Sequence, residues 1–168
     1  MQTEEIFLKA PTPFMQAHWH KLLPDWKTAP QVMVIVLLKA KYALEGEGEN
    51  ISQEKERLAA RMTILGGEFY RICHQAGILS EVISPKTGLP IYSQEGELNF
   101  DLVKTVHASL GFSYARTHKN CKVFQHPTWQ TAVYPGLFLS TASANNIRLI
   151  LEQLPLFRKD NVVLQQQS

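Results

Sequence analysis

The stretch Val32-Met33-Val34-Ile35-Val36-Leu37-Leu38 decides the fold of this chain. Every residue in it is apolar, and β-branched side chains predominate. A strand without a polar face is expected to be covered on both sides and therefore to lie in the centre of a sheet. The run is also far shorter than the roughly 20 apolar residues that a membrane-spanning helix needs.

The segments on either side are expected to supply helices that pack on this sheet. Residues 1–30 are rich in proline and aromatic residues, and we interpret them as a lead-in with a single short helix near residues 14–23. A long helix is predicted over residues 52–76, with Asn50 or Ser52 as its cap and Gly77 at its end. Its apolar residues recur at steps of four and three along one face. They are Leu58, Met62, Leu65, Phe69, Ile72 and Ala76.

Two adjacent glycines, Gly66 and Gly67, lie inside this predicted helix. Each costs about 1 kcal/mol of helix stability relative to alanine. Two explanations are open: another backbone or a ligand approaches the helix closely here, or the pair is a plain defect in the helix.

Shorter elements are predicted after the long helix. A strand over residues 78–83 is followed by a proline-glycine turn over residues 84–88 and a short return strand over residues 89–92. A second helix is predicted over residues 97–110, with Gly111 as its stop.

Two further strands and one helix are predicted toward the end of the chain. The strands lie near residues 121–125 and 130–141, and the second contains Pro135 and Gly136, which indicate a bulge or a sheet edge. Ser143 can cap the last helix, and residues 155–168 are predicted to form a frayed tail. The buried stripe of that helix is predicted to be Ile147, Ile150, Leu151 and Leu154.

Strands and helices are mixed without regular β-α-β alternation. The predicted class is therefore α+β: one domain over residues 1–168, with a mostly antiparallel sheet of three to five strands and packed helices. A content of 45% hydrophobic and 19% charged residues argues against disorder. The formal charge of +2 comes from scattered lysines and arginines, which argues against nucleic-acid binding.

The two cysteines, Cys73 and Cys121, do not form a disulfide framework. The first six residues include acids where a secretion signal or a transit peptide would carry bases. We therefore expect a soluble protein of the reducing cytoplasm, without a membrane anchor. Cys73 neighbours the apolar stripe of the long helix and is predicted to lie in the core.

Cys121 is the candidate functional residue. Cationic side chains at His118, Lys119, Lys122 and His126 would favour its thiolate, the form that binds soft metals. A packing role as a small buried hydrophobe stays open. A zinc site with His118 and His126 would lack the usual four ligands in close pairs. A nucleophilic role, with His126 or His107 as base, lacks an elbow motif.

Five segments occur in a characteristic order and spacing over residues 19–154. They are Leu22-Leu23-Pro24-Asp25, Ile72-Cys73, Ser84-Pro85-Lys86-Thr87-Gly88-Leu89, Leu110-Gly111-Phe112-Ser113, and Cys121-Lys122-Val123 followed by His126 and Trp129. In these segments the chain resembles the C-terminal domain of the methylmalonic aciduria and homocystinuria type D protein family, which traffics cobalamin.

The resemblance implies a fold similar to flavin nitroreductases and an adaptor rather than an enzyme. It implies no cofactor bound by the chain alone and no resident metal. Cobalamin would be held by a cobalamin-processing partner of related fold, for delivery to cobalamin-dependent enzymes. In the family a cysteine thiolate binds the cobalt. Animal members carry two adjacent cysteines before Lys-Val, and the first is the ligand; here Asn120 stands at that position and Cys121 at the second.

Two further function classes stay open. One is a flavin-dependent reductase, for which the implied fold is the only support. Its phosphate-binding candidates, Arg57, Arg61 and Arg71, have the spacing of a solvated helix face. The second is a homodimeric scaffold without a small ligand.

Overall fold

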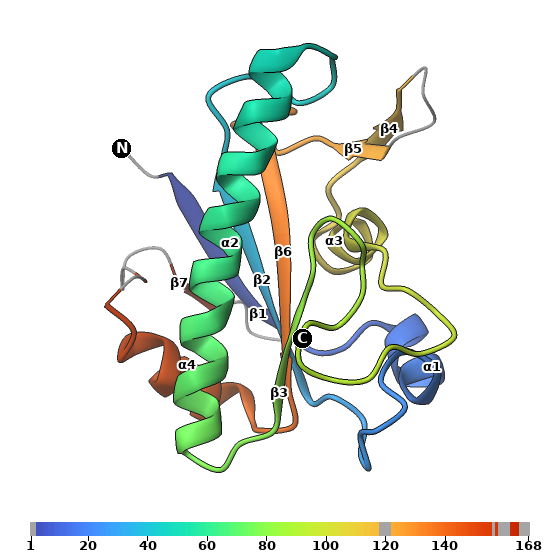
Figure 1. Cartoon of the computed structure of the whole chain (residues 1–168), viewed down its shortest axis with the longest axis vertical. Coiled ribbons are helices and arrows are strands. Elements are labelled where there is room, and N and C mark those ends of the chain that lie inside the picture. The colour runs from blue at the N-terminus through green and yellow to red at the C-terminus, as the bar shows by residue number, and fades with distance from the viewer. Residues whose placement is uncertain (1–2, 118–121, 156, 158–161, 165–168) are drawn as a thin grey trace.

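The computed structural model describes residues 3–117, 122–155, 157 and 162–164, the last three by their backbone alone. A five-stranded sheet with strand order β3-β6-β2-β1-β7 forms its centre, and a separate hairpin joins β4 to β5 (Figure 1). The strands are β1 (Glu4–Lys9), β2 (Val32–Lys39), β3 (Ser80–Ile83), β4 (Tyr114–Arg116), β5 (Lys122–Phe124), β6 (Val133–Ser140) and β7 (Val162–Leu164). The helices are α1 (Pro13–Leu22), α2 (Glu49–Gln75), α3 (Leu102–Leu110) and α4 (Ala144–Glu152).

The all-apolar stretch forms β2 and lies third of the five strands, as predicted. It pairs antiparallel with β1 on one side and with β6 on the other, and β3 pairs antiparallel with β6. Among the strands in the described residues, only β7 runs parallel to its neighbour, β1. The predicted class, α+β with a mostly antiparallel sheet, is therefore confirmed. The nitroreductase-like character of the fold stays a prediction of the resemblance.

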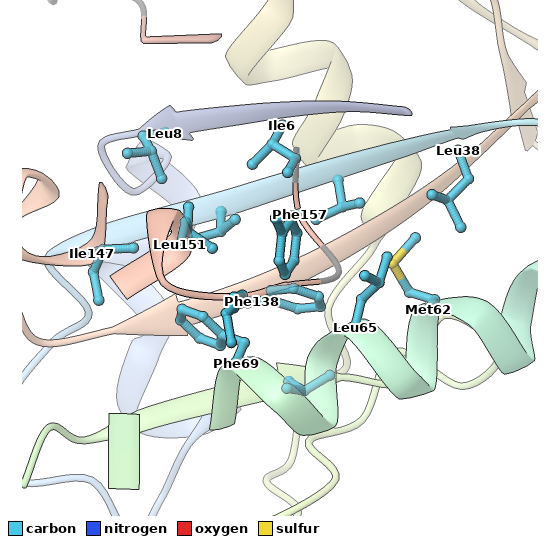
Figure 2. Close-up of a cluster of buried hydrophobic side chains, with 14 of the residues drawn as sticks. Ile6, Leu8, Leu38, Met62, Leu65, Phe69, Phe138, Ile147, Leu151 and Phe157 are labelled. Carbon is cyan, nitrogen blue, oxygen red and sulfur yellow. The ribbon is translucent and has the colours of Figure 1, made fainter. Parts of the chain in front are cut away.

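Alternate residues of β2 enter two separate cores, because successive side chains of a strand point to opposite faces. Val34 and Val36 pack under α2 and α4, whereas Met33 and Ile35 pack under α1 and α3. Figure 2 shows the first core, where Met62, Leu65 and Phe69 of α2 meet Phe138 of β6. Ile6 and Leu8 of β1 and Ile147 and Leu151 of α4 complete it.

Helix α2 packs on the sheet at Gly66. A methyl group added there would lie 2.6 Å from Val82 Cγ1 and 3.2 Å from Phe138 Cε1, whereas one at Gly67 would meet only the Tyr92 hydroxyl, at 3.7 Å. Of the two explanations left open for this pair, a plain defect does not describe Gly66, because the helix is closely approached there by the side chains of Val82 and Phe138.

The start of α2 differs from the prediction, whereas its end agrees with it. The helix begins at Glu49, and its capping residue is Gly48, which has no side chain that could accept a hydrogen bond from the first turn. The predicted caps Asn50 and Ser52 are therefore wrong. The predicted end at Gly77 is confirmed: its φ is +71°, and the next N–H, of Ile78, donates to the Cys73 carbonyl at 2.8 Å.

The lead-in prediction missed a strand. Residues Glu4–Lys9 form β1, although the short helix is present as α1. The predicted frayed tail is also wrong in part, because Val162–Leu164 pair with β1 as β7. Both strands are short and lie toward one side of the sheet. Polar residues next to them in the sequence interrupt the run of apolar residues by which a strand is recognised.

The second predicted helix starts later than expected. Asp101 is its cap, so α3 begins at Leu102 rather than at residue 97. The return strand predicted over residues 89–92 is reduced to an isolated bridge between Ile83 and Pro90. Instead, the fully buried carboxylate of Glu81 holds this segment by accepting N–H bonds from Val82, Tyr92 and Ser93, at 2.8, 3.0 and 2.6 Å.

Strand β6 begins at Val133, after turn residues that the sequence prediction had assigned to the strand. Pro135 and Gly136 pair with β2 in unbroken register, so no bulge occurs there. Strand β3 ends opposite Leu137, which leaves Pro135 at a local sheet edge, the second explanation that the sequence offered for this pair. The last helix is as predicted, with Ser143 accepting from the Asn146 N–H at 3.2 Å.

Candidate functional site around the β4–β5 hairpin

The candidate cysteine belongs to the connection of the β4–β5 hairpin. Tyr114 lies opposite Phe124 and Arg116 opposite Lys122, so residues 117–121 join the two strands. The predicted site residues Asn120 and Cys121 lie outside the described residues, as do His118 and Lys119. The hairpin itself stands away from the central sheet, beside α3 (Figure 1).

The charge of Lys122, the residue after Cys121, is balanced by a carboxylate. Its Nζ pairs with Asp101 Oδ2, while Asp101 Oδ1 accepts the Lys104 N–H at 3.0 Å and caps α3. Burial raises the pKa of Asp101, but the hydrogen bonds from Lys122 and Lys104 outweigh it and leave that pKa below the ordinary value. Lys122 therefore anchors the hairpin to α3.

His126 has both ring nitrogens occupied. Its Nδ1 accepts the N–H groups of Thr128 and Trp129, each at 3.0 Å, so Nε2 carries the hydrogen and donates it to Glu5 Oε1. The ring is buried and stacks on Trp129 with centroids 4.2 Å apart. His126 therefore builds the turn over residues 126–129 and has no nitrogen left for zinc or for a thiol.

His107, the other histidine considered as a base, and Cys73, the cysteine predicted to lie in the core, are both engaged within the fold. His107 Nδ1 donates a hydrogen bond to the Phe112 carbonyl oxygen at 2.8 Å. Cys73 is fully buried, as predicted, and burial raises the pKa of its thiol to about 11. Among the described residues there is no group of histidines, cysteines and carboxylates that could hold a metal ion.

An open cleft of about 810 Å³ lies between the hairpin, the start of α3, the turn over residues 84–88 and the first half of α2. Buried apolar side chains such as Phe100, Phe124 and Val133 line it. Two ion pairs border it, one between Lys122 and Asp101 and one between Lys86 and Glu56. The Lys86 ammonium lies 2.7 Å from both Glu56 oxygens.

The predicted proline-glycine turn shapes this cleft. Gly88 has φ +71°, and a methyl group there would lie 2.2 Å from the Phe100 carbonyl oxygen, so only glycine fits. Its carbonyl accepts the Phe100 N–H at 2.8 Å. Tyr134 also lines the cleft, where burial raises the pKa of its hydroxyl to about 12.

Sequence reasoning missed the acids that hold this region together. Asp101 could have been found, because an aspartate directly before an apolar helical run is a cap signal. Glu5 could not, since it lies 121 positions from His126 in a strand that was itself missed. No helix in the described part of the chain has the length and apolarity needed to cross a bilayer.

Comparison with known proteins identifies the chain. No curated protein sequence matches it with significance. The family model for the methylmalonic aciduria and homocystinuria type D protein matches residues 3–154, which is most of the chain and includes β1, α2, the hairpin and the cleft. This chain therefore belongs to the methylmalonic aciduria and homocystinuria type D protein family, and its role lies in cobalamin metabolism.

Proposed function

We propose that this chain is a cobalamin-trafficking adaptor without enzymatic activity. It binds a cobalamin-processing partner of related fold and contacts the cobalt through the thiolate of Cys121. The observation that carries the proposal is the family match over residues 3–154, which spans the segment containing Cys121. Delivery to cobalamin-dependent enzymes follows from the same family role.

The size of the cleft supports a partner as the holder of cobalamin. A drug-sized ligand fills a pocket of roughly 300 to 1,000 Å³. The cleft beside the hairpin has about 810 Å³ and is open, whereas cobalamin, a corrin ring with a nucleotide tail, is much larger than a drug. We therefore place the corrin in the partner, with the adaptor supplying one ligand.

The position of the hairpin supports the thiolate contact. Ala115 and Arg116 of β4 are exposed, and Lys122, which pairs with Arg116 at the end of the hairpin next to the connection, is bound to Asp101. A thiolate is a soft anionic ligand that suits cobalt. In the proposed exchange the Cys121 thiol releases its proton to solvent, and its sulfur replaces the water bound to the cobalt of cob(III)alamin. No electron is transferred, and the cysteine must be reduced, as in the cytoplasm.

Analytical sedimentation with corrin absorbance tests the adaptor proposal. A mixture of the chain with a processing partner loaded with cob(III)alamin should give a faster species that contains both proteins and the corrin. Two separately sedimenting proteins would contradict the proposal.

The two alternative functions have tests of their own. Sedimentation of the chain alone shows whether it forms a homodimer. A yellow colour that remains after addition of FMN and desalting would favour the flavin-dependent reductase.

A further inference from the structure

A second hollow, of about 550 Å³, lies beside α2 at the end of the sheet where β1 begins and β2 ends. It is separate from the cleft: Lys55 and Glu56 of α2 line the cleft, whereas Arg57 and Arg61 line this hollow. Its cations come from two regions of the chain. They are Lys39 at the end of β2, Lys41 just after it, and Arg57 and Arg61 on α2.

A buried carboxylate fixes Arg57. Arg57 Nε donates to Glu54 Oε1 at 2.6 Å and Nη2 donates to Oε2 at 2.9 Å, while Oε2 also accepts the Lys41 N–H. Glu54 is 4% exposed, and the hydrogen bond from Arg57 leads the causes that lower its pKa. The paired edge of the guanidinium is thus held by an ionised acid, and its Nη1 group takes no part in this pair.

Arg61 lies one turn further along α2 and is placed by another buried acid. Its Nη2 is 3.6 Å from Glu4 Oε2, and the Glu4 side chain is only 8% exposed. Residues four apart on a helix are neighbours on its surface. Two buried carboxylates therefore orient two half-exposed guanidinium groups along one wall of the hollow.

The side chains that surround the hollow carry more positive than negative charge. Lys39, Lys41 and the two arginines line it as four cations. The acids of the same wall are Glu4, which lines the hollow, and Glu54, which holds Arg57 from behind. The lining and its two acids together therefore carry a net charge of about +2, in a concave site where an anion would be attracted.

We propose that this hollow, defined by Lys39, Lys41, Arg57 and Arg61, binds a phosphate-type oxyanion of charge −2 or more. The planar arginine groups match tetrahedral oxyanions, and lysines add point charges. The volume exceeds that of one phosphate, so the attached group of a phosphate ester also fits. The proposal does not depend on the cobalamin role.

Titration of the ¹⁵N-labelled full chain, followed by heteronuclear NMR at constant ionic strength, tests this site. The ligands added are inorganic phosphate, pyrophosphate and adenosine diphosphate. Saturable shifts should appear at the Lys41 amide and at the Arg57 and Arg61 side chains. Adenosine diphosphate binding more tightly than pyrophosphate would support a phosphate ester as the ligand. Equal binding would support the free oxyanion.

Lys41→Gln is the principal variant, because Lys41 contacts Glu54 through its backbone N–H and the bond survives the substitution. It should weaken binding roughly threefold or more, as the loss of one exposed charge pair does. Arg71→Gln removes an exposed cation of the same helix, outside the hollow, and should leave binding unchanged. Absence of saturable binding, or equal weakening by both variants, would overturn the proposal.

Discussion

Lys122 of the hairpin forms an ion pair with Asp101, the residue that caps α3. One carboxylate thus performs two tasks: Oδ1 satisfies a backbone N–H of the helix, and Oδ2 anchors the strand that follows Cys121. The hairpin is therefore held in place by a side chain directly adjacent in sequence to the proposed ligand.

Asp101→Ala should lower the free energy of unfolding by about 1 to 2 kcal/mol, the usual effect of losing a helix cap. Asp101→Asn keeps the cap and loses only the half-exposed ion pair, so it should cost clearly less. Urea unfolding followed by circular dichroism measures both. Equal losses for the two variants would show that the cap is not what Asp101 supplies.

The same residue predicts an acid dependence. The pKa of Asp101 is lower in the folded protein than its ordinary value of 3.8, so its contribution is present above that pH and is lost as the pH falls further. The difference in stability between the wild type and Asp101→Asn should therefore shrink below about pH 4. A difference that stays constant down to pH 2 would contradict this assignment.

Gly66 and Gly67 form a matched pair for testing the packing of α2. Gly67→Ala has room and should stabilise the protein by about 0.5 to 1 kcal/mol through helix propensity. Gly66→Ala would clash with Val82 and should instead destabilise by about 1 to 3 kcal/mol, the usual effect of overpacking. Thermal unfolding midpoints that move in the same direction for both variants would contradict the close approach at Gly66.

His126→Ala should destabilise by about 2 to 4 kcal/mol, because it leaves two turn N–H groups and the Glu5 carboxylate without their partner. His126→Asn offers an oxygen near the position of Nδ1 and should recover part of the loss. If His126 were instead a metal ligand, chelator treatment of the wild type would reproduce the effect of the substitution. We expect chelators to leave the unfolding curve unchanged.

The elements that the sequence predicts well are those with a strong local pattern. The apolar run of β2, the Ser143 cap and the stripe of α2 from Leu58 to Phe69 each depend on neighbouring residues, and each is present. The predicted end of that stripe is wrong, because Cys73 rather than Ile72 is the buried residue there and Ala76 is exposed beyond the end of the helix. Strands β1 and β7 are short and draw their stability from pairing partners distant in the chain. Local pattern carries little information about such pairings.

The site follows the same division. The Gly88 turn and the buried Cys73 were predictable because a turn and a helix face are local features. The role of His126 was not, since it is decided by Glu5, more than a hundred residues away. Cationic neighbours in sequence suggested an activated thiol, but Lys122 is neutralised by Asp101, which only the tertiary structure reveals.

Cys73 predicts a loss of stability in alkali. Its folded pKa of about 11 lies above the reference value of 9.0, so the contribution is fully present below pH 9 and is lost between pH 9 and 11. Full loss corresponds to roughly 3 kcal/mol. The stability difference between the wild type and Cys73→Ala should fall across this window. Tyrosines titrate in both proteins and cancel in the difference, which would stay flat with pH if the thiol were not buried.

The visible spectrum of cob(III)alamin held by a processing partner tests the central claim most directly. Addition of the wild-type chain should produce the spectral shift of a cobalt–thiolate complex. Cys73→Ala, which removes the other cysteine and leaves Cys121 in place, should preserve that shift. Asn120→Cys restores the cysteine pair of the animal proteins and should retain or strengthen the shift. We expect Cys121→Ser to abolish it; a shift of undiminished size with Cys121→Ser would contradict the proposed role of Cys121.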